Sequence, residues 1–555
     1  MMGRFVQRRI VRAAALRGPA MILGFAASAC ITLDGCGGSS TAATPRAAAP
    51  QRAASVTFTM RWPGTNATAS ARKPRFVSPS AQSVVVEVNA SGSPAGPITF
   101  ANNPSLNGAP ATSTITIDAP PGRDDFSIAL FDQPQVAGET STAGNQIGRA
   151  EITQTIASGV LNKLDAVIAG IVGGVRVAPA ANQPFVETLS ATPPQAYALA
   201  GDQPATFVLT AVDPDGNVIV PVDTSPAHVD TPQLALAASG ATSELTVAPV
   251  AGDPSRFVVT ATSPKTAPGS ALALRATATD GAGDHAQSNV AIDERSAVYV
   301  TYGSGSSTTV AVFDDAGNRI ALPPGAFAGL SDPGAIAYDA DDRRVFIADS
   351  GKIAAFDASG NAVAGYSAPV APGANGIAYD RNAKLIYVSS PGTVSIFTPN
   401  GAPPGTGPPA FPAAHAAGIA YVPGATPQLA VANADATTPS FDLYAEDGTP
   451  VASYPIGGTA PPTAIAYAPS SAMLYVASGT TIASFALSGA PGPAATDAHQ
   501  PAALACDLDL GELYAIERST GTLAAYALDL SGIDAAHGIP ALSAGPNPKG
   551  VALAF

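Results

Sequence analysis

The chain has 555 residues, enough for about three or four domains. Charged residues make up only 12% of it, with 41 acidic against 27 basic side chains, and glycine and proline together number 106. From residue 296 onward, 20 acidic residues face 8 basic ones. This acidic balance excludes nucleic acid as an expected partner, because nucleic-acid binding depends on neutralising phosphate charge.

The N-terminal segment, residues 1–35, has the pattern of a secretory signal. Five arginines precede the first acidic residue, Asp34, and an apolar stretch at 20–33 follows the basic part. That stretch is too short to favour a permanent membrane span. Ordinary secretion with cleavage near Ala29 is the alternative to the processing described next, and the arginine pair at 8–9 is interpreted as simple charge.

The segment ends in Leu-Asp-Gly-Cys, and this ending resembles the bacterial lipobox, with an unusual aspartate at position 34. The resemblance implies that Cys36 becomes the first residue of a mature lipoprotein and carries acyl chains, palmitate among them. It also implies an exported protein tethered to the bacterial membrane. In an organism with two membranes, Gly37 after the cysteine resembles lipoproteins sorted to the outer one.

Residues 36–54 follow as a flexible linker, because glycine, serine, alanine, threonine and proline dominate them and cannot form a core. Two strand-rich ranges come next, at 55–180 and 185–293. Each contains about six or seven short apolar or alternating runs separated by turn residues, which is typical of an immunoglobulin-like (Ig-like) β-sandwich. The run at 161–172 is the one long candidate for a helix, with a strand equally favoured.

The C-terminal range, 296–555, is built on a repeated phrase. It reads GAIAYD at 334–339 and recurs with spacings of 41, 42, 46, 39 and 47 residues, ending in KGVALA at 549–554. A second apolar run, a third run ending in glycine and a weaker fourth run follow each phrase. A period of this length predicts stacked units of four antiparallel strands, the blade of a β-propeller.

The two ends of this range predict how many blades there are. The range opens at 297–302 with a second strand, and the chain stops after a lone first strand at 548–555. Pairing these two runs completes a sixth blade and leaves no open sheet edge. The expected fold class is therefore all-β: Ig-like sandwiches followed by a six-bladed β-propeller closed by the C-terminal strand.

The repeated units, of the form "GIAYD … LYVAS … V-FD--G", resemble the NHL and YVTN-type propeller families over residues 296–555. The resemblance is strong evidence for the fold and weak evidence for the function, since such propellers serve as binding platforms, scaffolds and enzymes. Propeller lactonases would use carboxylates and asparagine around a metal in the channel.

No catalytic residue is predicted, because the chain has no recognisable nucleophile, phosphate-loop or zinc motif. Of its five histidines, three lie in the range 296–555: His415, His499 and His537. They are expected on solvated loops, none beside a carboxylate at metal-ligand spacing. Cys506 replaces the tyrosine of the repeated phrase and is expected to be a small buried residue. With Cys30 removed and Cys36 acylated, it could form no disulfide within the chain.

The best candidate site consists of three carboxylates that follow the innermost strands, at Asp339, Asp380 and Asp507. Together they could hold Ca²⁺, which takes six to eight oxygens. The alternative is that each is an ordinary turn residue, and the other blades, with Val422 and Ala468 at this position, favour the alternative.

Two functions fit these observations. The favoured one is a cell-envelope lipoprotein whose propeller, displayed on Ig-like spacers, binds a protein or glycan partner. It requires no cofactor and no catalysis. The alternative is an exported propeller enzyme of lactonase or lyase type with a channel site, possibly dependent on a metal.

Overall fold

The structure is a computed structural model of the chain. It describes residues 54–62, 77–90, 98–104, 111–137, 143–166, 168–219, 232–240, 244–262, 272–281, 283–303, 309–366, 368–497, 499–507, 511–532 and 547–554. These residues form strands and turns, so the all-β prediction is confirmed. None of the described residues belongs to a helix long and apolar enough to cross a membrane. The predicted signal, Cys36 and linker residues 36–53 lie outside the described residues, whereas Ala54, predicted as the end of the linker, begins the first strand.

The first group of strands forms two sheets around one core. One sheet has the order β4-β1-β7 and the other β3-β2-β5-β6-β8. Trp62, at the end of β1, is fully buried in that core, and its ring N–H donates to Ser113 Oγ at 2.7 Å. The strands are β1 (Ala54–Trp62), β2 (Ser83–Ala90), β3 (Ile98–Asn102), β4 (Ala111–Ala119), β5 (Gly122–Phe131), β6 (Gln146–Ile156), β7 (Asn162–Leu164) and β8 (Ala169–Gly170).

The second group also forms two sheets around one core, in the orders β10-β11-β17-β16-β13 and β14-β15-β12-β9. Strand β9 pairs antiparallel with β12, so residues 174–179, which the sequence analysis placed in the first range, are hydrogen-bonded into the second group. The strands are β9 (Gly174–Pro179), β10 (Val186–Ser190), β11 (Gln195–Ala200), β12 (Ala205–Val212), β13 (Gln233–Gly240), β14 (Leu245–Val250), β15 (Asp253–Ala261), β16 (Leu272–Thr279) and β17 (His285–Arg295).

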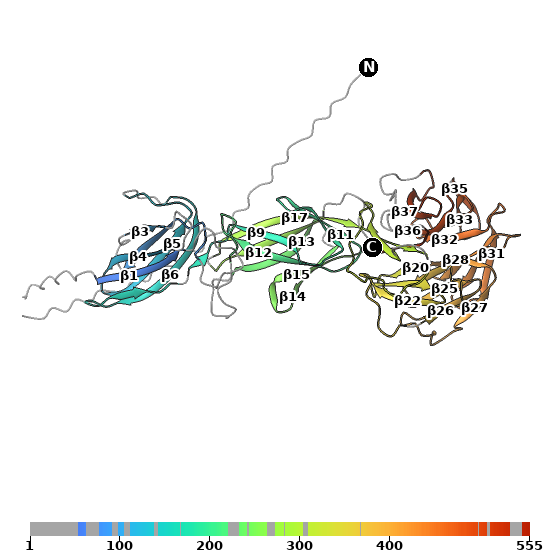
Figure 1. Cartoon of the computed structure of the whole chain (residues 1–555), viewed down its shortest axis with the longest axis horizontal. Coiled ribbons are helices and arrows are strands. Elements are labelled where there is room, and N and C mark those ends of the chain that lie inside the picture. Colours follow the sequence, from blue (N-terminus) through green and yellow to red (C-terminus); the bar gives the residue numbers. More distant parts are fainter. Residues whose placement is uncertain are drawn as a thin grey trace, which may run out of the picture. The chain divides into compact units, whose positions relative to one another are not determined.

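The described residues from 297 on form six further antiparallel sheets, drawn in yellow to red in Figure 1. The first contains β18 (Ala297–Tyr302), β19 (Val310–Asp314) and β39 (Pro548–Ala554). The second contains β20 (Pro333–Asp339), β21 (Arg344–Asp349), β22 (Lys352–Asp357) and β23 (Ala368–Pro369). The third contains β24 (Gly376–Asp380), β25 (Leu385–Ser390), β26 (Gly392–Phe397) and β27 (Ala410–Ala413).

The remaining three sheets repeat this order. They contain β28 (Ala416–Val422), β29 (Gln428–Asn433), β30 (Ser440–Ala445) and β31 (Pro450–Pro455); β32 (Pro462–Ala468), β33 (Met473–Ser478), β34 (Thr481–Ala486) and β35 (Pro491–Thr496); and β36 (Pro501–Asp507), β37 (Glu512–Glu517) and β38 (Thr522–Ala527). We call β20, β24, β28, β32, β36 and β39 the first strands, because each carries the repeated phrase.

The first strands contact one another in series, and β39 contacts both β36 and β20. Strand β39 also pairs antiparallel with β18, from Ala297 opposite Ala554 to Thr301 opposite Gly550. Six sheets whose first strands meet in this way fit a β-propeller. Small side chains on the first strands allow the close approach: a Cβ on Gly550 would lie 2.5 Å from the carbonyl oxygen of Gly334.

Glycine ends the turn after most of the third strands, as the sequence predicted. The backbone there has positive φ, between 80° and 87°, at Gly317, Gly360, Gly401, Gly448 and Gly489. A side chain would be strained in this conformation. At Gly448 it would also collide with Phe411, whose ring lies 2.4 Å from the position of a Cβ.

Candidate functional site

The three predicted carboxylates, at the ends of their first strands, are all buried. Asp339 Oδ1 accepts hydrogen bonds from the backbone N–H groups of Asp341 and Asp342, at 2.9 and 3.3 Å. Burial raises the pKa of Asp339, and the backbone bonds oppose that rise. Asp380 Oδ1 accepts in the same way from Asn382 and Ala383, at 2.8 and 3.2 Å. Each of these two carboxylates therefore stabilises the turn that directly follows its strand.

Asp507 has a different partner. Its Oδ2 accepts a hydrogen bond of 2.5 Å from Ser296 Oγ, and its backbone carbonyl accepts from the N–H of Gly511. In the described part of the chain, the structure does not bring the three carboxylates together as ligand atoms within 4.8 Å of one another. The calcium site at Asp339, Asp380 and Asp507 stays a prediction.

A cavity of about 610 Å³ lies at the other end of the first strands, where each of them begins. Most of its lining is small, which leaves room at the centre of the six sheets. Residues at or just before the start of every first strand contribute to it: Gly334, Ala374, Ala417, Pro462, Ala502 and Lys549.

Charged side chains of both signs border this cavity. Lys549 Nζ pairs with Asp332 Oδ1 at 2.8 Å, and Arg518 and Asp349 also line the wall. Asp349 is buried and accepts hydrogen bonds from the N–H groups of Ser331 and Asp332, at 2.9 and 2.7 Å. The end of β21 thus positions Asp332, which in turn meets the lysine of β39. The cavity is therefore suited to a polar ligand that carries charge.

Asp349 belongs to a set of polar residues that end the second strands near the cavity. Each side chain interacts either with the loop that leads into the first strand of the same sheet or with the turn that directly follows its own second strand. The pattern holds for Asp349, Ser390, Asn433, Ser478 and Glu517. Ser390 and Ser478, for example, donate to the carbonyl oxygens of Ala371 and Ala460.

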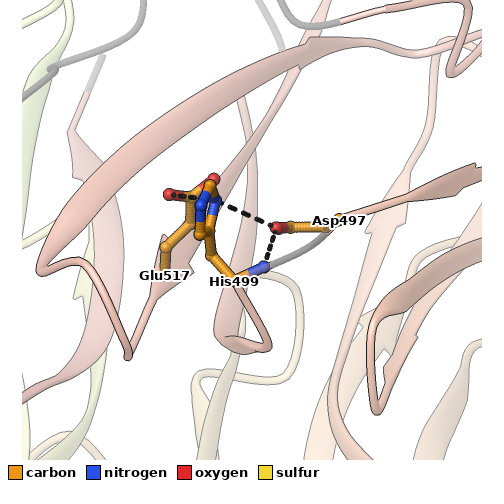
Figure 2. Close-up of side chains that lie close together, drawn as sticks. All are labelled: Asp497, His499 and Glu517. Carbon is orange, nitrogen blue, oxygen red and sulfur yellow. Dashed lines mark hydrogen bonds and ion pairs between the residues drawn. The ribbon is translucent and has the colours of Figure 1, made fainter.

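In the last sheet, this position brings three potential metal ligands together (Figure 2). His499 lies in the loop between β35 and β36, and its Nδ1 is 3.3 Å from Glu517 Oε2 at the end of β37. The same nitrogen is 3.7 Å from Asp497 Oδ1, which also accepts a hydrogen bond of 2.8 Å from the backbone N–H of His499. We call Asp497, His499 and Glu517 the rim cluster.

The rim cluster corrects the expectation that no histidine lies beside a carboxylate. His415 also differs from that expectation, with its Nε2 3.6 Å from Asp435 Oδ2. The spacing Asp-x-His at 497–499 was the visible signal. Its partner Glu517 could be found only by aligning the ends of the second strands. His228 and His537 lie outside the described residues.

Comparison with known proteins finds no matching family model and no match among curated proteins. Solved structures that resemble the chain include a nidogen/laminin complex, at 14% identity and a TM-score of 0.37 over 47% of this chain and 98% of that one. A Bacteroides caccae protein of unknown function matches at 11% identity and a TM-score of 0.35, over 46% and 98% of the two chains. Hydrazine synthase of Kuenenia stuttgartiensis matches at 12% and 0.31, over 42% and 93%.

Proposed function

We propose that the chain is an exported, lipid-anchored envelope protein that acts as a binding scaffold. Acylated Cys36 is its tether, and palmitate is among the acyl chains. Two Ig-like β-sandwiches act as spacers, and the C-terminal sheets form a six-bladed propeller of NHL/YVTN type. The pairing of β39 with β18 and the serial contacts of the first strands support closure of that propeller.

One observation carries the binding function: the cavity at the start of the first strands has all six of them in its wall. Its small residues leave space, and its charged residues offer both a carboxylate and cationic groups. Charged groups of both signs, Asp332, Arg518 and Lys549, stand among these small residues. This composition supports recognition of a charged group on a protein or glycan.

The test compares the full chain, purified in detergent, with two variants of the cavity wall. We expect Lys549→Ala and Arg518→Ala to weaken binding to a panel of charged glycans and peptides, with a steep dependence on salt. Arg381→Ala is the matched control, because that arginine is exposed and lies outside the cavity wall. Equal binding by all of these proteins would contradict the proposal.

The same panel distinguishes the enzyme alternative. Lactones and uronic-acid polymers included in it report hydrolysis or elimination directly. Turnover that disappears in the cavity variants would replace the scaffold with an exported lactonase or lyase.

Lipidation is tested separately by mass spectrometry of the mature N-terminus in a bacterial host. The expected product begins at Cys36 with a diacylglycerol group, and a Cys36→Ser variant is released from the membrane fraction. An unmodified N-terminus near residue 29 would overturn this part of the proposal.

A further inference from the structure

The rim cluster combines two carboxylates and one imidazole in the geometry of a metal site. Its ligand atoms all lie within 4.8 Å of one another. The two distances from His499 Nδ1, 3.3 and 3.7 Å, are close to the separation of about 3.4 Å between ligands of a tetrahedral ion bound at about 2.1 Å. His499 Nδ1 is thus spaced from each carboxylate as two ligands of one ion would be.

Burial makes the two carboxylates costly without a cation. The side chains of Asp497 and Glu517 are only 1% and 6% exposed, whereas that of His499 is 48% exposed. Asp497 Oδ2 is buried and makes no hydrogen bond to the described part of the chain. A buried carboxylate requires a compensating partner, and a bound ion would supply one.

The neighbouring hydroxyl groups support the carboxylates but cannot neutralise them. Glu517 Oε2 accepts hydrogen bonds from Thr520 and Thr522. The phenol of Tyr526 also interacts with Asp497, and it brings no positive charge. Hydrogen bonds of this kind orient metal ligands in known sites.

The equivalent position in another sheet shows what differs here. Asp349 also ends a second strand, but backbone N–H groups of residues 331 and 332 and the Ser331 hydroxyl satisfy its oxygens. In the last sheet Glu517 keeps hydroxyl donors, but on the loop side it faces the imidazole of His499 in place of backbone N–H groups. Neutral imidazole can ligate a metal, whereas an N–H donor cannot.

We propose that the rim cluster binds a divalent transition-metal ion of the Zn²⁺ class through Asp497, His499 Nδ1 and Glu517 Oε2. An imidazole with two carboxylates suits such an ion better than Ca²⁺, which prefers oxygen ligands alone. The half-exposed histidine leaves the remaining coordination positions open to solvent. The ion fastens the loop between β35 and β36 to β37, and this role is independent of ligand binding in the cavity.

The test is titration of the full, chelator-treated chain in detergent with Zn²⁺, in competition with a chromophoric chelator. We expect one tight site per chain. His499→Ala and Glu517→Gln should each weaken it by more than the roughly 10–100-fold that loss of an outer-sphere partner costs. Glu517→Gln keeps an oxygen that Thr520 and Thr522 can donate to, so it separates ligation from folding of the loop.

His415→Ala is the matched control, because His415 faces one carboxylate, Asp435, where His499 faces two. We expect this variant to bind Zn²⁺ as the wild-type chain does. The proposal is overturned if the chain binds no Zn²⁺, if His499→Ala leaves the affinity unchanged, or if Ca²⁺ displaces Zn²⁺ at equal concentration. Far-ultraviolet circular dichroism of each variant shows whether the fold is retained.

Discussion

The hydroxyl of Ser296 donates a hydrogen bond of 2.5 Å to Asp507 Oδ2, across 211 residues of chain. Ser296 is the single residue between β17 and β18, whereas Asp507 ends β36. Both residues are buried. The bond therefore joins the residue before the first C-terminal sheet to a strand of the last one.

Replacing Ser296 with alanine should lower the free energy of unfolding by about 1–3 kcal/mol, the cost of leaving a buried acceptor oxygen without one donor. Chemical denaturation monitored by far-ultraviolet circular dichroism measures this change. Ser531→Ala is the control, because Ser531 is exposed and should change stability by less than about 0.5 kcal/mol. A loss no larger than that of the control would mean that the bond does not contribute.

Removal of residues 548–555 should severely destabilise the six C-terminal sheets. Strand β18 would lose its neighbour β39 and expose a hydrophobic edge, since the side chains of Val298 and Val300 are fully buried beside it. We expect aggregation or loss of the cooperative transition in a thermal melt. The milder variant Leu553→Ala should cost about 2–5 kcal/mol, because Leu553 is buried. A truncated chain that melts like the wild type would contradict closure by this strand.

Asp339→Asn should change how stability depends on pH. Burial raises the pKa of Asp339 above the ordinary value of 3.8 in the folded chain, so the folded state holds the proton more tightly than the unfolded one. Its contribution favours folding in acid and is lost as pH rises through the folded pKa. The variant should therefore gain stability relative to wild type between acidic and neutral pH.

Denaturation of both proteins at a series of pH values measures that difference. Asparagine retains an oxygen that can accept from the N–H groups of Asp341 and Asp342, so the turn is preserved. Asp447→Asn is a control of opposite sign, because hydrogen bonds from Thr449 lower the pKa of that exposed carboxyl. Parallel curves for wild type and Asp339→Asn would refute the prediction.

Thiol titration tests the fate of the three cysteines. Cys506 is half-buried, not fully buried as the sequence predicted. Desolvation, followed by the charge of Asp507, raises the pKa of Cys506, so its thiol should react more slowly with a disulfide reagent in the folded chain than in denaturant. The denatured mature protein should show one thiol, because the proposed processing removes Cys30 and acylates Cys36. Three thiols would point to cleavage near Ala29 without acylation.

The repeat made the C-terminal strands predictable from sequence. The predicted second run at 297–302 coincides with β18 and the repeated phrase at 334–339 lies within β20, because the period directly reports strands. The boundary between the first and second groups of strands, which lies within residues 161–180, was harder to predict from the sequence. A Cβ on Gly173 would lie 2.4 Å from the backbone nitrogen of Pro214, a close approach that separates β8 from β9 and leaves no mark on apolar periodicity.

The rim cluster was missed for a related reason. Its histidine and its glutamate are 18 residues apart, and the pairing of Pro501 with Glu517 brings the loop and the strand end together. Strand register is encoded in the repeat, whereas the position of His499 depends on local contacts such as its backbone hydrogen bond to Asp497. Only two of the three residues of the cluster, Asp497 and His499, are close enough in sequence to form a recognisable motif.

The connection between β17 and β18 is short, and this affects how the two strands resist a pulling force. Only Ser296 separates the two strands, and β18 is clamped between β19 and β39. Tension transmitted along β17 into β18 would load the hydrogen bonds on both sides of β18 in shear, so that they must fail together rather than one by one. The connection between β17 and β18 would thus resist a pulling force applied across it.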